Sequence, residues 1–292
     1  MNIIQFNKEN LIKSPLNYVV GKYKLLPQIL PLFPDNINTF VDLFCGGCNV
    51  AVNVKADKII CNDTIEEVID LYNNFYMLGS TEYIINQIEN VVNEFNLFKD
   101  NQENYLKLRE YYNHVNKEWE YFYTLICHSF SNQIRFNSKR EFNLPFGKRT
   151  FNSNMKDNLI KFVNYLQDTN MEFTNLDFRE VDISKLTNSD FCYIDPPYLI
   201  TCATYNEKGG WKEKDERDLL NLLDKLNGNG VRFALSNVLE SKGNSNDILK
   251  EWIKDKRYNI HNLDVKYGNA NYQRKDKDDS TTMEVLITNY WN

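Results

Sequence analysis

The segment FCYIDPPY, residues 191–198, joins a short apolar run to an acidic residue, two prolines and an aromatic ring. The apolar run 191–194 predicts a buried strand. Proline has no N–H group to extend a central ladder and biases the preceding residue toward extended geometry, so the strand must stop at Asp195. Asp195 is then expected at the carboxyl end of the strand, where open α/β sheets bind their ligands.

Strand-like and helix-like segments alternate on both sides of this stretch. Strands are expected at 38–44, 58–63, 171–178, 191–194, 231–237, 258–265 and 283–290. Helical apolar spacing is seen at 64–78, where Thr64 is a candidate cap, and near 212–226 and 246–253, and a helix is also expected from residue 49. This alternation predicts an α/β fold with a doubly wound sheet.

The region from about residue 80 to 131 has an almost wholly helical pattern and is rich in Tyr, Phe and Asn. Two strand-like segments, 133–137 and 140–147, follow it and predict a hairpin. Because no linker is visible, we interpret residues 79–149 as an insertion into one domain formed by residues 1–78 and 150–292.

Composition sets broad limits. The chain has 292 residues, 42% of them apolar, and a net charge of −6, which disfavours indiscriminate binding to polyanions. Apolar runs are too short to span a bilayer, and the first ten residues lack the pattern of a signal peptide. We therefore expect an intracellular protein whose six cysteines are reduced.

The segment VDLFCGGCNVAV, residues 41–52, ends a predicted strand with Gly46 and Gly47, which would let the backbone approach a ligand closely. Asp63 ends the next strand and could accept hydrogen bonds from two ribose hydroxyls. The alternatives are an ordinary tight turn and a helix cap. Cys45 and Cys48 also form a C-x-x-C pattern, typical of thioredoxin-like redox sites, whereas a zinc site would need further ligands.

Asp195 and Pro196 offer a rigid pair of acceptors, the carboxylate and the carbonyl, for the hydrogens of one amino group. Such acceptors would stabilise the positive charge that grows on an exocyclic base nitrogen as it attacks a methyl sulfonium. Tyr198 would supply a face for base stacking, worth roughly 1–3 kcal/mol. The alternative is a diproline turn with its tyrosine packed inside.

Six segments in this order resemble the Dam-like (D12 class, alpha group) DNA adenine-N6 methyltransferases. They are GKYKLLPQI, VDLFCGGCNV, IRFNSKREFNLPFGKR, DPPY and the late strands FALSN and EVLITNY, and the similarity runs from about Pro15 to Tyr290. The resemblance implies a Rossmann-like S-adenosylmethionine-dependent methyltransferase sheet with an inserted, mainly helical target-recognition domain.

The resemblance also implies roles for individual positions. Lys22 matches a position suited to the methionine carboxylate of S-adenosylmethionine, Asp63 the ribose-binding acid, and Asp177 with Phe178 the pair near the cofactor adenine. The full cofactor set is Tyr18, Lys22, Phe44, Gly46, Gly47, Asp63, Asp177, Phe178 and Asp195. The catalytic set is Asp195, Pro196, Pro197 and Tyr198.

The hairpin is the expected DNA-binding element, because it matches the family's recognition hairpin and concentrates basic side chains beside Asn and Gln. Arg140, Asn17 and Gln133 depart from the residues that are frequent at their positions in the family, and GATC is the recognition sequence that the family suggests. The expected DNA-binding residues are Arg135, Asn137, Lys139, Arg140, Asn143, Lys148 and Arg149.

Together these residues predict an enzyme that flips an adenine out of duplex DNA and methylates its N6 by direct displacement, releasing S-adenosylhomocysteine without a metal. We expect it in the cytoplasm of a bacterial or phage-infected bacterial cell, with double-stranded DNA as its partner. The sequence leaves open whether a restriction endonuclease acts on the same site, and such an enzyme would not form a stable complex with it. RNA adenine methylation, the more distant cytosine-N4 methylation, a C-x-x-C redox protein and a non-catalytic DNA binder are the alternatives.

Overall fold

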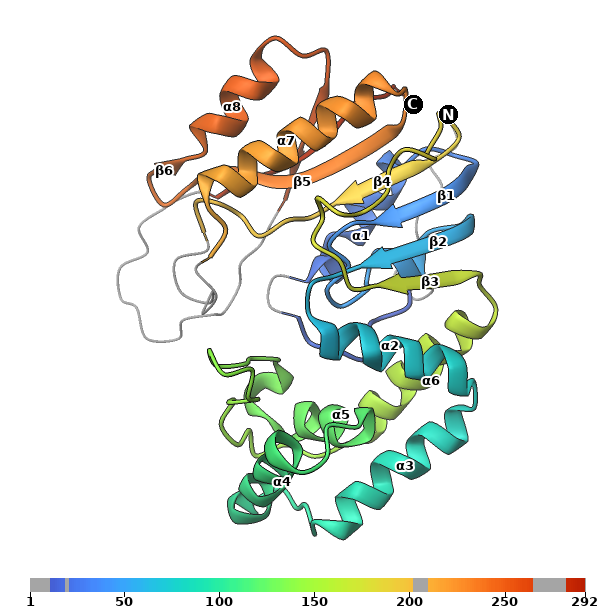
Figure 1. Ribbon diagram of the computed structural model, residues 1–292, viewed down its shortest axis with the longest axis vertical. Coiled ribbons are helices and arrows are strands. Elements are labelled where there is room, and N and C mark those ends of the chain that lie inside the picture. The colour runs from blue at the N-terminus through green and yellow to red at the C-terminus, as the bar shows by residue number, and fades with distance from the viewer. Residues whose placement is uncertain (1–10, 19–20, 202–209, 265–281, 292) are drawn as a thin grey trace.

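One mixed sheet forms the centre of the computed structural model, which describes residues 11–18, 21–201, 210–264 and 282–291 (Figure 1). Within these ranges the strand order is β3-β2-β1-β4-β5-β8-β7, and β6 pairs with β5. The strands are β1 (Ile37–Asp42), β2 (Ala56–Asn62), β3 (Met171–Thr174), β4 (Phe191–Ile194), β5 (Arg232–Ser241), β6 (Asn244–Ser245), β7 (Asn259–Leu263) and β8 (Met283–Thr288).

The pairing is parallel from β3 to β5, and the three remaining pairs, β5 with β6, β5 with β8 and β7 with β8, are antiparallel. The prediction of an α/β fold with a mostly parallel sheet is therefore confirmed. All four residues of β4 are buried, which explains its continuous apolar run, because a central parallel strand is covered on both faces.

Helices cover both faces of the sheet (Figure 1). On one face α7 and α8 pack over Val41, Cys192 and Ile287. On the other face Phe33, which follows α1, packs against Phe40 of β1, and Tyr72 of α2 packs against Phe173 of β3. None of the helices described is long and apolar enough to cross a membrane. The helices are α1 (Leu26–Ile29), α2 (Glu66–Leu78), α3 (Thr81–Glu94), α4 (Gln102–His114), α5 (Trp119–His128), α6 (Ser153–Gln167), α7 (Glu213–Gly228) and α8 (Asp247–Lys254).

Two local predictions are wrong. The helix expected after the glycine turn is only a 3-10 turn, Ala51–Asn53, because Val54 is already extended and leads into β2. Thr64 does not cap α2, which starts after Ile65 without a side-chain cap. Instead the Asp63 carboxylate accepts a hydrogen bond from the Ile65 N–H at 3.0 Å.

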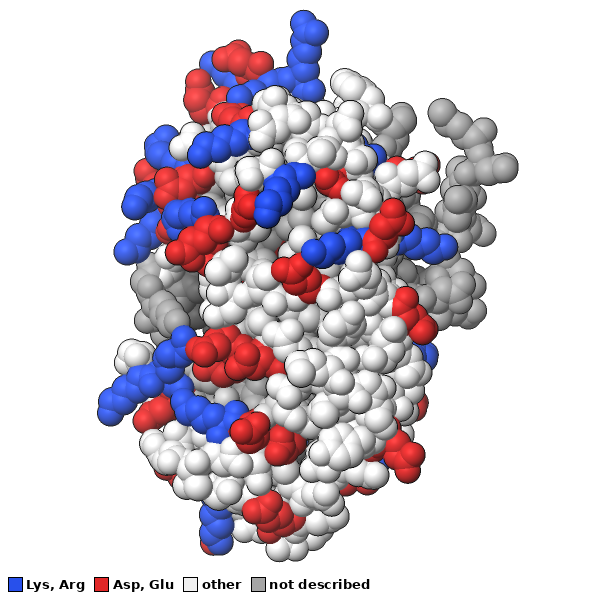
Figure 2. Space-filling model, turned by 45° about the vertical axis from the view of Figure 1, so that its right-hand side comes forward, with Lys and Arg blue, Asp and Glu red and all other residues white. Residues whose placement is uncertain are grey.

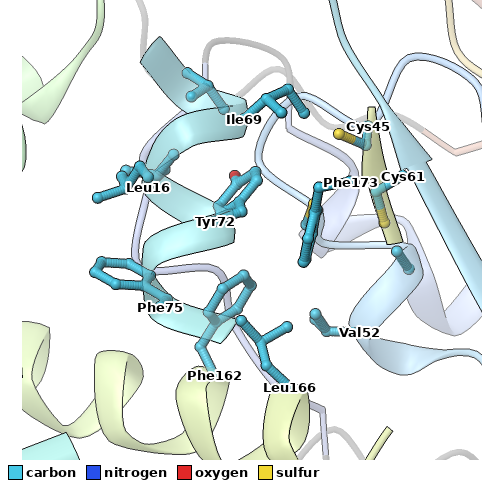
Figure 3. Close-up of a cluster of buried hydrophobic side chains, with 14 of the residues drawn as sticks. Leu16, Cys45, Val52, Cys61, Ile69, Tyr72, Phe75, Phe162, Leu166 and Phe173 are labelled. Carbon is cyan, nitrogen blue, oxygen red and sulfur yellow. The ribbon is translucent and has the colours of Figure 1, made fainter. Parts of the chain in front are cut away.

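The segment between α2 and α6 forms a helical layer beyond one edge of the sheet (Figure 1). In this layer α5 packs against α2, α3 and α4, while α6 contacts α2 and α3. Its buried side chains belong to the same apolar cluster as one face of the sheet. Tyr72 and Phe75 of α2 meet Phe162 of α6 and Phe173 of β3 in this cluster (Figure 3). The helical layer and the sheet therefore share a continuous core.

Candidate active site

Asp195 lies directly after β4, between the carboxyl ends of β1 and β5. It lines a cavity of about 590 Å³, within the usual range for ligand pockets. The glycine turn after β1, the DPPY segment and the hairpin all contribute to the wall. The predicted site residues in this wall are Tyr18, Lys22, Phe44, Gly46, Gly47, Asp63, Arg135, Asn137, Arg140, Asp195, Pro196, Pro197 and Tyr198.

The glycine turn is held in one conformation by two side chains. Gly46 has a φ of +46°, a region that favours glycine, and a Cβ there would lie 3.2 Å from the Tyr18 ring. The Gly46 N–H donates to Asp63 Oδ2 at 2.9 Å, and the Tyr72 hydroxyl donates to the Gly46 carbonyl at 2.8 Å. The strand ends of β1 and β2 are thus joined at the cavity.

Asp63 therefore uses both carboxylate oxygens on backbone N–H groups, those of Gly46 and Ile65. Burial raises the pKa of Asp63, and these backbone hydrogen bonds oppose that effect. The structure places Asp63 at the cavity, as its position after β2 predicts. Its role toward a ribose stays a prediction.

Asp195 belongs to a buried polar network with Lys22. Lys22 Nζ lies 2.8 Å from Asp195 Oδ1 and 3.4 Å from Glu284 Oε1, and the Lys22 side chain is only 4% exposed. Burial raises the pKa of Asp195, and the ammonium of Lys22 opposes the rise. Lys22 was expected to face a cofactor carboxylate. In the structure it contacts two protein carboxylates, and the sequence pattern does not reveal these partners.

Tyr198 turns its hydroxyl into the same network. The Tyr198 oxygen lies 2.9 Å from Asp195 Oδ1 and 3.1 Å from Glu284 Oε1, and Lys22 donates a hydrogen bond to it. Because a tyrosine hydroxyl carries one hydrogen, it can serve only one carboxylate at a time. The ring lines the cavity but is 6% exposed, and its stacking role stays a prediction.

Several residues of the cavity wall escaped the sequence analysis, and two buried carboxylates, Asp42 in the wall and Glu284 beside it, matter most for its charge. Asp42 ends β1 at the cavity; it is buried, and its Oδ1 has no hydrogen-bond partner among the described residues. Burial raises the pKa of Asp42, and the nearby Asp195 and Asp63 raise it further. Its place at a strand end, like that of Asp195, was the available signal. Glu284 had a weaker signal, a single acid inside the apolar strand β8.

The hairpin closes one side of the cavity. Phe136 and Phe142 form an antiparallel bridge, and Arg135 donates to Asn143 Oδ1 at 2.7 Å and to its carbonyl at 3.0 Å. Arg140 makes a bidentate ion pair with Glu67 of α2, at 2.8 and 2.9 Å. Arg135 and Asn143 are thus paired with each other, while Arg140 is held against the sheet domain.

Main-chain atoms anchor the hairpin to α4. The Tyr105 hydroxyl donates to the Leu144 carbonyl at 2.9 Å, and the Asn113 side chain bonds both the N–H of Phe142 at 2.8 Å and its carbonyl at 3.1 Å. Gly147 has no room for a Cβ, because the Ser129 carbonyl occupies that position. The second half of the hairpin, at Phe142 and Leu144, is therefore fixed by main-chain contacts that do not involve the side chains at the tip.

The remaining basic residues of the hairpin region, Lys139, Lys148 and Arg149, are exposed. On the face drawn in Figure 2, basic and acidic side chains are interspersed. That face offers no continuous basic surface, so binding of a polyanion there would depend on local contacts.

Asp177 and Phe178 do not line the cavity. Asp177 pairs with Arg179 at 3.0 Å, and Phe178 is buried with ring-centroid distances of 5.5 Å to Phe44 and 5.6 Å to Trp211. Of these rings only Phe44 reaches the cavity wall, so the expected adenine-binding role of Asp177 and Phe178 stays a prediction.

The cysteines beside the glycine turn are buried free thiols. Figure 3 shows the sulfur atoms of Cys45 and Cys61 within the apolar cluster under α2. Burial raises the pKa of Cys45 and Cys48, whereas a redox-active cysteine needs a lowered pKa and access to solvent. This environment argues against the redox alternative. Cys202, also expected to be reduced, lies outside the described residues.

Several known proteins are similar to this chain over most of its length. The modification methylase StsI of Streptococcus sanguinis is 46% identical over 295 residues, which cover 99% of this chain and 44% of StsI. The type II methyltransferase M.FokI of Planomicrobium okeanokoites is 45% identical over 287 residues, 96% of this chain and 43% of M.FokI. The chain thus spans less than half the length of these two relatives.

A relative of matching length is the type II methyltransferase M1.LlaDCHI of Lactococcus lactis subsp. cremoris, 28% identical over 305 residues that cover 100% of both chains. Residues 18–269 match the family model described as D12 class N6 adenine-specific DNA methyltransferase. With the Asp-Pro-Pro-Tyr motif at the end of β4 and the glycine turn after β1, this match shows that the chain belongs to the D12 class N6 adenine-specific DNA methyltransferases.

Proposed function

We propose that this chain methylates the N6 amino group of adenine in duplex DNA, with S-adenosylmethionine as the methyl donor and S-adenosylhomocysteine as the product. The observation that carries the proposal is the position of Asp195, which shares one cavity with the glycine turn and with the hairpin. A base delivered by the hairpin side and a donor held at the glycine turn would meet at Asp195. The cavity size suits a ligand of this kind.

The residues at the glycine turn fit a cationic donor. Asp42, Asp63 and Asp195 are three carboxyl groups of the cavity wall, and burial raises the pKa of all three. A positively charged ligand would offset the cost of keeping these carboxylates ionised. The unpartnered Asp42 Oδ1 offers an acceptor for an ammonium group. S-adenosylmethionine would supply an electrophilic methyl group on a sulfonium.

Asp195 and Pro196 would bind and orient the adenine amino group. The carboxylate and the Pro196 carbonyl accept its two hydrogens, which favours a tetrahedral nitrogen and stabilises the positive charge that grows there. Tyr198 packs beside the base and contributes roughly 1–3 kcal/mol if it stacks on it. The N–C bond would form as the sulfur–methyl bond breaks, and the methylated nitrogen would then give up one proton through the Asp195 carboxylate to water. Asp195 must therefore be ionised, both to accept the hydrogen bonds and to take this proton.

For DNA, we propose that residues 79–149 act as the target-recognition insertion, which would present the hairpin to a base flipped toward the cavity. The proposed DNA-contacting residues are Arg135, Asn137, Lys139, Arg140, Asn143, Lys148 and Arg149. GATC stays the candidate recognition sequence. Relatives named as modification methylases support a bacterial cytoplasmic setting and a restriction endonuclease acting on the same site.

The test is to incubate the native chain with methyl-labelled S-adenosylmethionine and unmethylated duplex DNA, digest the product to nucleosides and map the label. Label on N6-methyladenine at one short motif is the expected result, and that motif replaces GATC if it differs. Parallel reactions with RNA test the nearest alternative. Label confined to RNA, or turnover by Asp195→Ala close to the native rate, would contradict the proposal.

A further inference from the structure

Glu284 is a buried carboxylate in a strand that otherwise presents apolar residues. It lies in β8, pairs with Val238 of β5 in the sheet register and is 1% exposed. An ionised carboxylate costs several kcal/mol to bury unless charged or hydrogen-bonding partners compensate it. Its partners include the same two groups that contact Asp195, namely Lys22 and the Tyr198 hydroxyl.

Lys22 and Tyr198 are therefore shared between two carboxylates. Lys22 Nζ lies 2.8 Å from Asp195 and 3.4 Å from Glu284, and the Tyr198 oxygen lies 2.9 Å from Asp195 and 3.1 Å from Glu284. Each donor can pass from one acceptor to the other with a shift of a few tenths of an ångström. The two arrangements differ mainly in which carboxylate is neutralised.

This choice matters if Asp195 acts on an amino group, so the inference rests on the proposed function. An ammonium in contact with Asp195 weakens that carboxylate as an acceptor and repels positive charge growing on the adenine nitrogen. The same ammonium held by Glu284 would leave the charge of Asp195 available to the amino group. Electrostatic stabilisation in a dry site depends on such preorganised charges.

We propose that Glu284 is a positioning residue that takes Lys22 and the Tyr198 hydroxyl from Asp195 when the adenine amino group binds. Asp195 then keeps its charge for the substrate, and the ammonium stays buried without losing its counter-ion. β8 holds Glu284 rigidly, because it pairs with β5 on one side and β7 on the other. Other described groups that face the network include Tyr193, Ser236 and Asp42.

Glu284→Gln tests this proposal, because it keeps the side-chain shape and removes the charge. We expect kcat to fall on the order of 100-fold, the scale for losing one preorganised electrostatic group. The KM for DNA and the calorimetric affinity for S-adenosylhomocysteine should stay within about threefold of native, since the group acts on the reacting state. A merely structural loss would weaken binding as well.

The pH profile provides an independent readout. The charge of Glu284 raises the pKa of Asp195, and the reaction requires ionised Asp195. Glu284→Gln should therefore move the acid limb of the kcat profile to lower pH while the plateau falls. The matched control is Glu216→Gln, which removes another fully buried carboxylate, one that binds Trp211, Asn237 and Asn246. It should cost stability and leave the acid limb in place.

A double-mutant cycle with Lys22→Gln completes the test. If Glu284 acts through Lys22, the double variant should be no more than about threefold less active than Lys22→Gln alone. A double variant whose loss of kcat equals the product of the two single losses would overturn the proposal. If Glu284→Gln does not fold, Glu284→Asp takes its place. It keeps the charge and should retain at least a tenth of native kcat, and a stably folded Glu284→Asp below that level would also overturn the proposal.

An active native chain with Glu284→Gln within threefold of its kcat would overturn this inference alone. A native chain that transfers no methyl group to DNA would overturn the proposed function, and the inference with it.

Discussion

Replacing Gly46 by alanine should destabilise the glycine turn by an amount that its backbone geometry sets. Gly46 has a φ of +46°, and the new Cβ would lie 3.2 Å from two carbon atoms of the Tyr18 ring. A side chain in this region costs about 1–2 kcal/mol, and the tight ring contact adds to the loss. Urea unfolding of Gly46→Ala should therefore show a free energy of unfolding lower by about 1–2 kcal/mol.

Gly47→Ala is the matched control on the adjacent residue. Gly47 has no positive φ, and its Cβ would meet Asn49 Nδ2 at 3.2 Å and Ser14 Oγ at 3.5 Å. The reduced entropy of the unfolded chain offsets this contact, so the change should stay within about 0.5 kcal/mol. If the turn in Gly46→Ala rearranges to make room for the new methyl group, binding of S-adenosylhomocysteine should weaken about 5–30-fold. An equal or larger loss of stability at Gly47 would refute the reasoning.

Three further predictions concern charge and the thiols. Glu67→Gln releases Arg140 from its ion pair and should tighten DNA binding about fivefold, as measured by fluorescence anisotropy. The control Glu66→Gln should have a smaller effect, because Glu66 makes only one contact with Arg140, at 3.2 Å. Unchanged affinity in Glu67→Gln would argue that Arg140 does not reach DNA. Burial raises the pKa of Asp42, so the contribution of Asp42 to stability is full at acid pH and is lost as the pH rises through the raised pKa. Asp42→Asn should therefore gain stability relative to the native chain as the pH rises. Free energies of unfolding in urea that change equally with pH in both proteins would contradict this. Cys45→Ser with Cys48→Ser should leave methyl transfer within about threefold of native, because buried thiols of raised pKa are poor redox groups; a folded but inactive double variant would restore the redox alternative.

Periodicity and proline chemistry predict the sheet well. The run before Asp195 forms the central strand β4, and the acidic residue falls at its carboxyl end, as the diproline requires. The helix expected from residue 49 fails, since apolar spacing alone does not show that the chain becomes extended at Val54 to enter β2. Helix α6 is absent from the expectations, although it supplies Phe162 and Leu166 to the core.

Long-range partners are the part that sequence reasoning could not supply. Lys22 and Glu284 are far apart in the chain and meet only because β8 inserts beside β5. Arg140 was expected to face DNA, yet its partner in the structure is Glu67 of α2. In both cases the side-chain chemistry was evident from the sequence, but the choice of partner depends on the packed fold.

The main-chain anchoring of the hairpin has a consequence for how recognition can diversify. The bonds from Tyr105 and Asn113 end on the backbone of Leu144 and Phe142, and a main-chain atom is the same whatever residue carries it. Substitution of an exposed tip side chain such as Lys139 leaves these anchors in place, whereas Asn137 itself holds the turn, because its Oδ1 accepts hydrogen bonds from the N–H groups of Lys139 and Glu141. The exposed positions of the hairpin tip can therefore be substituted one side chain at a time, and so acquire new base preferences, while the main-chain anchors stay unchanged.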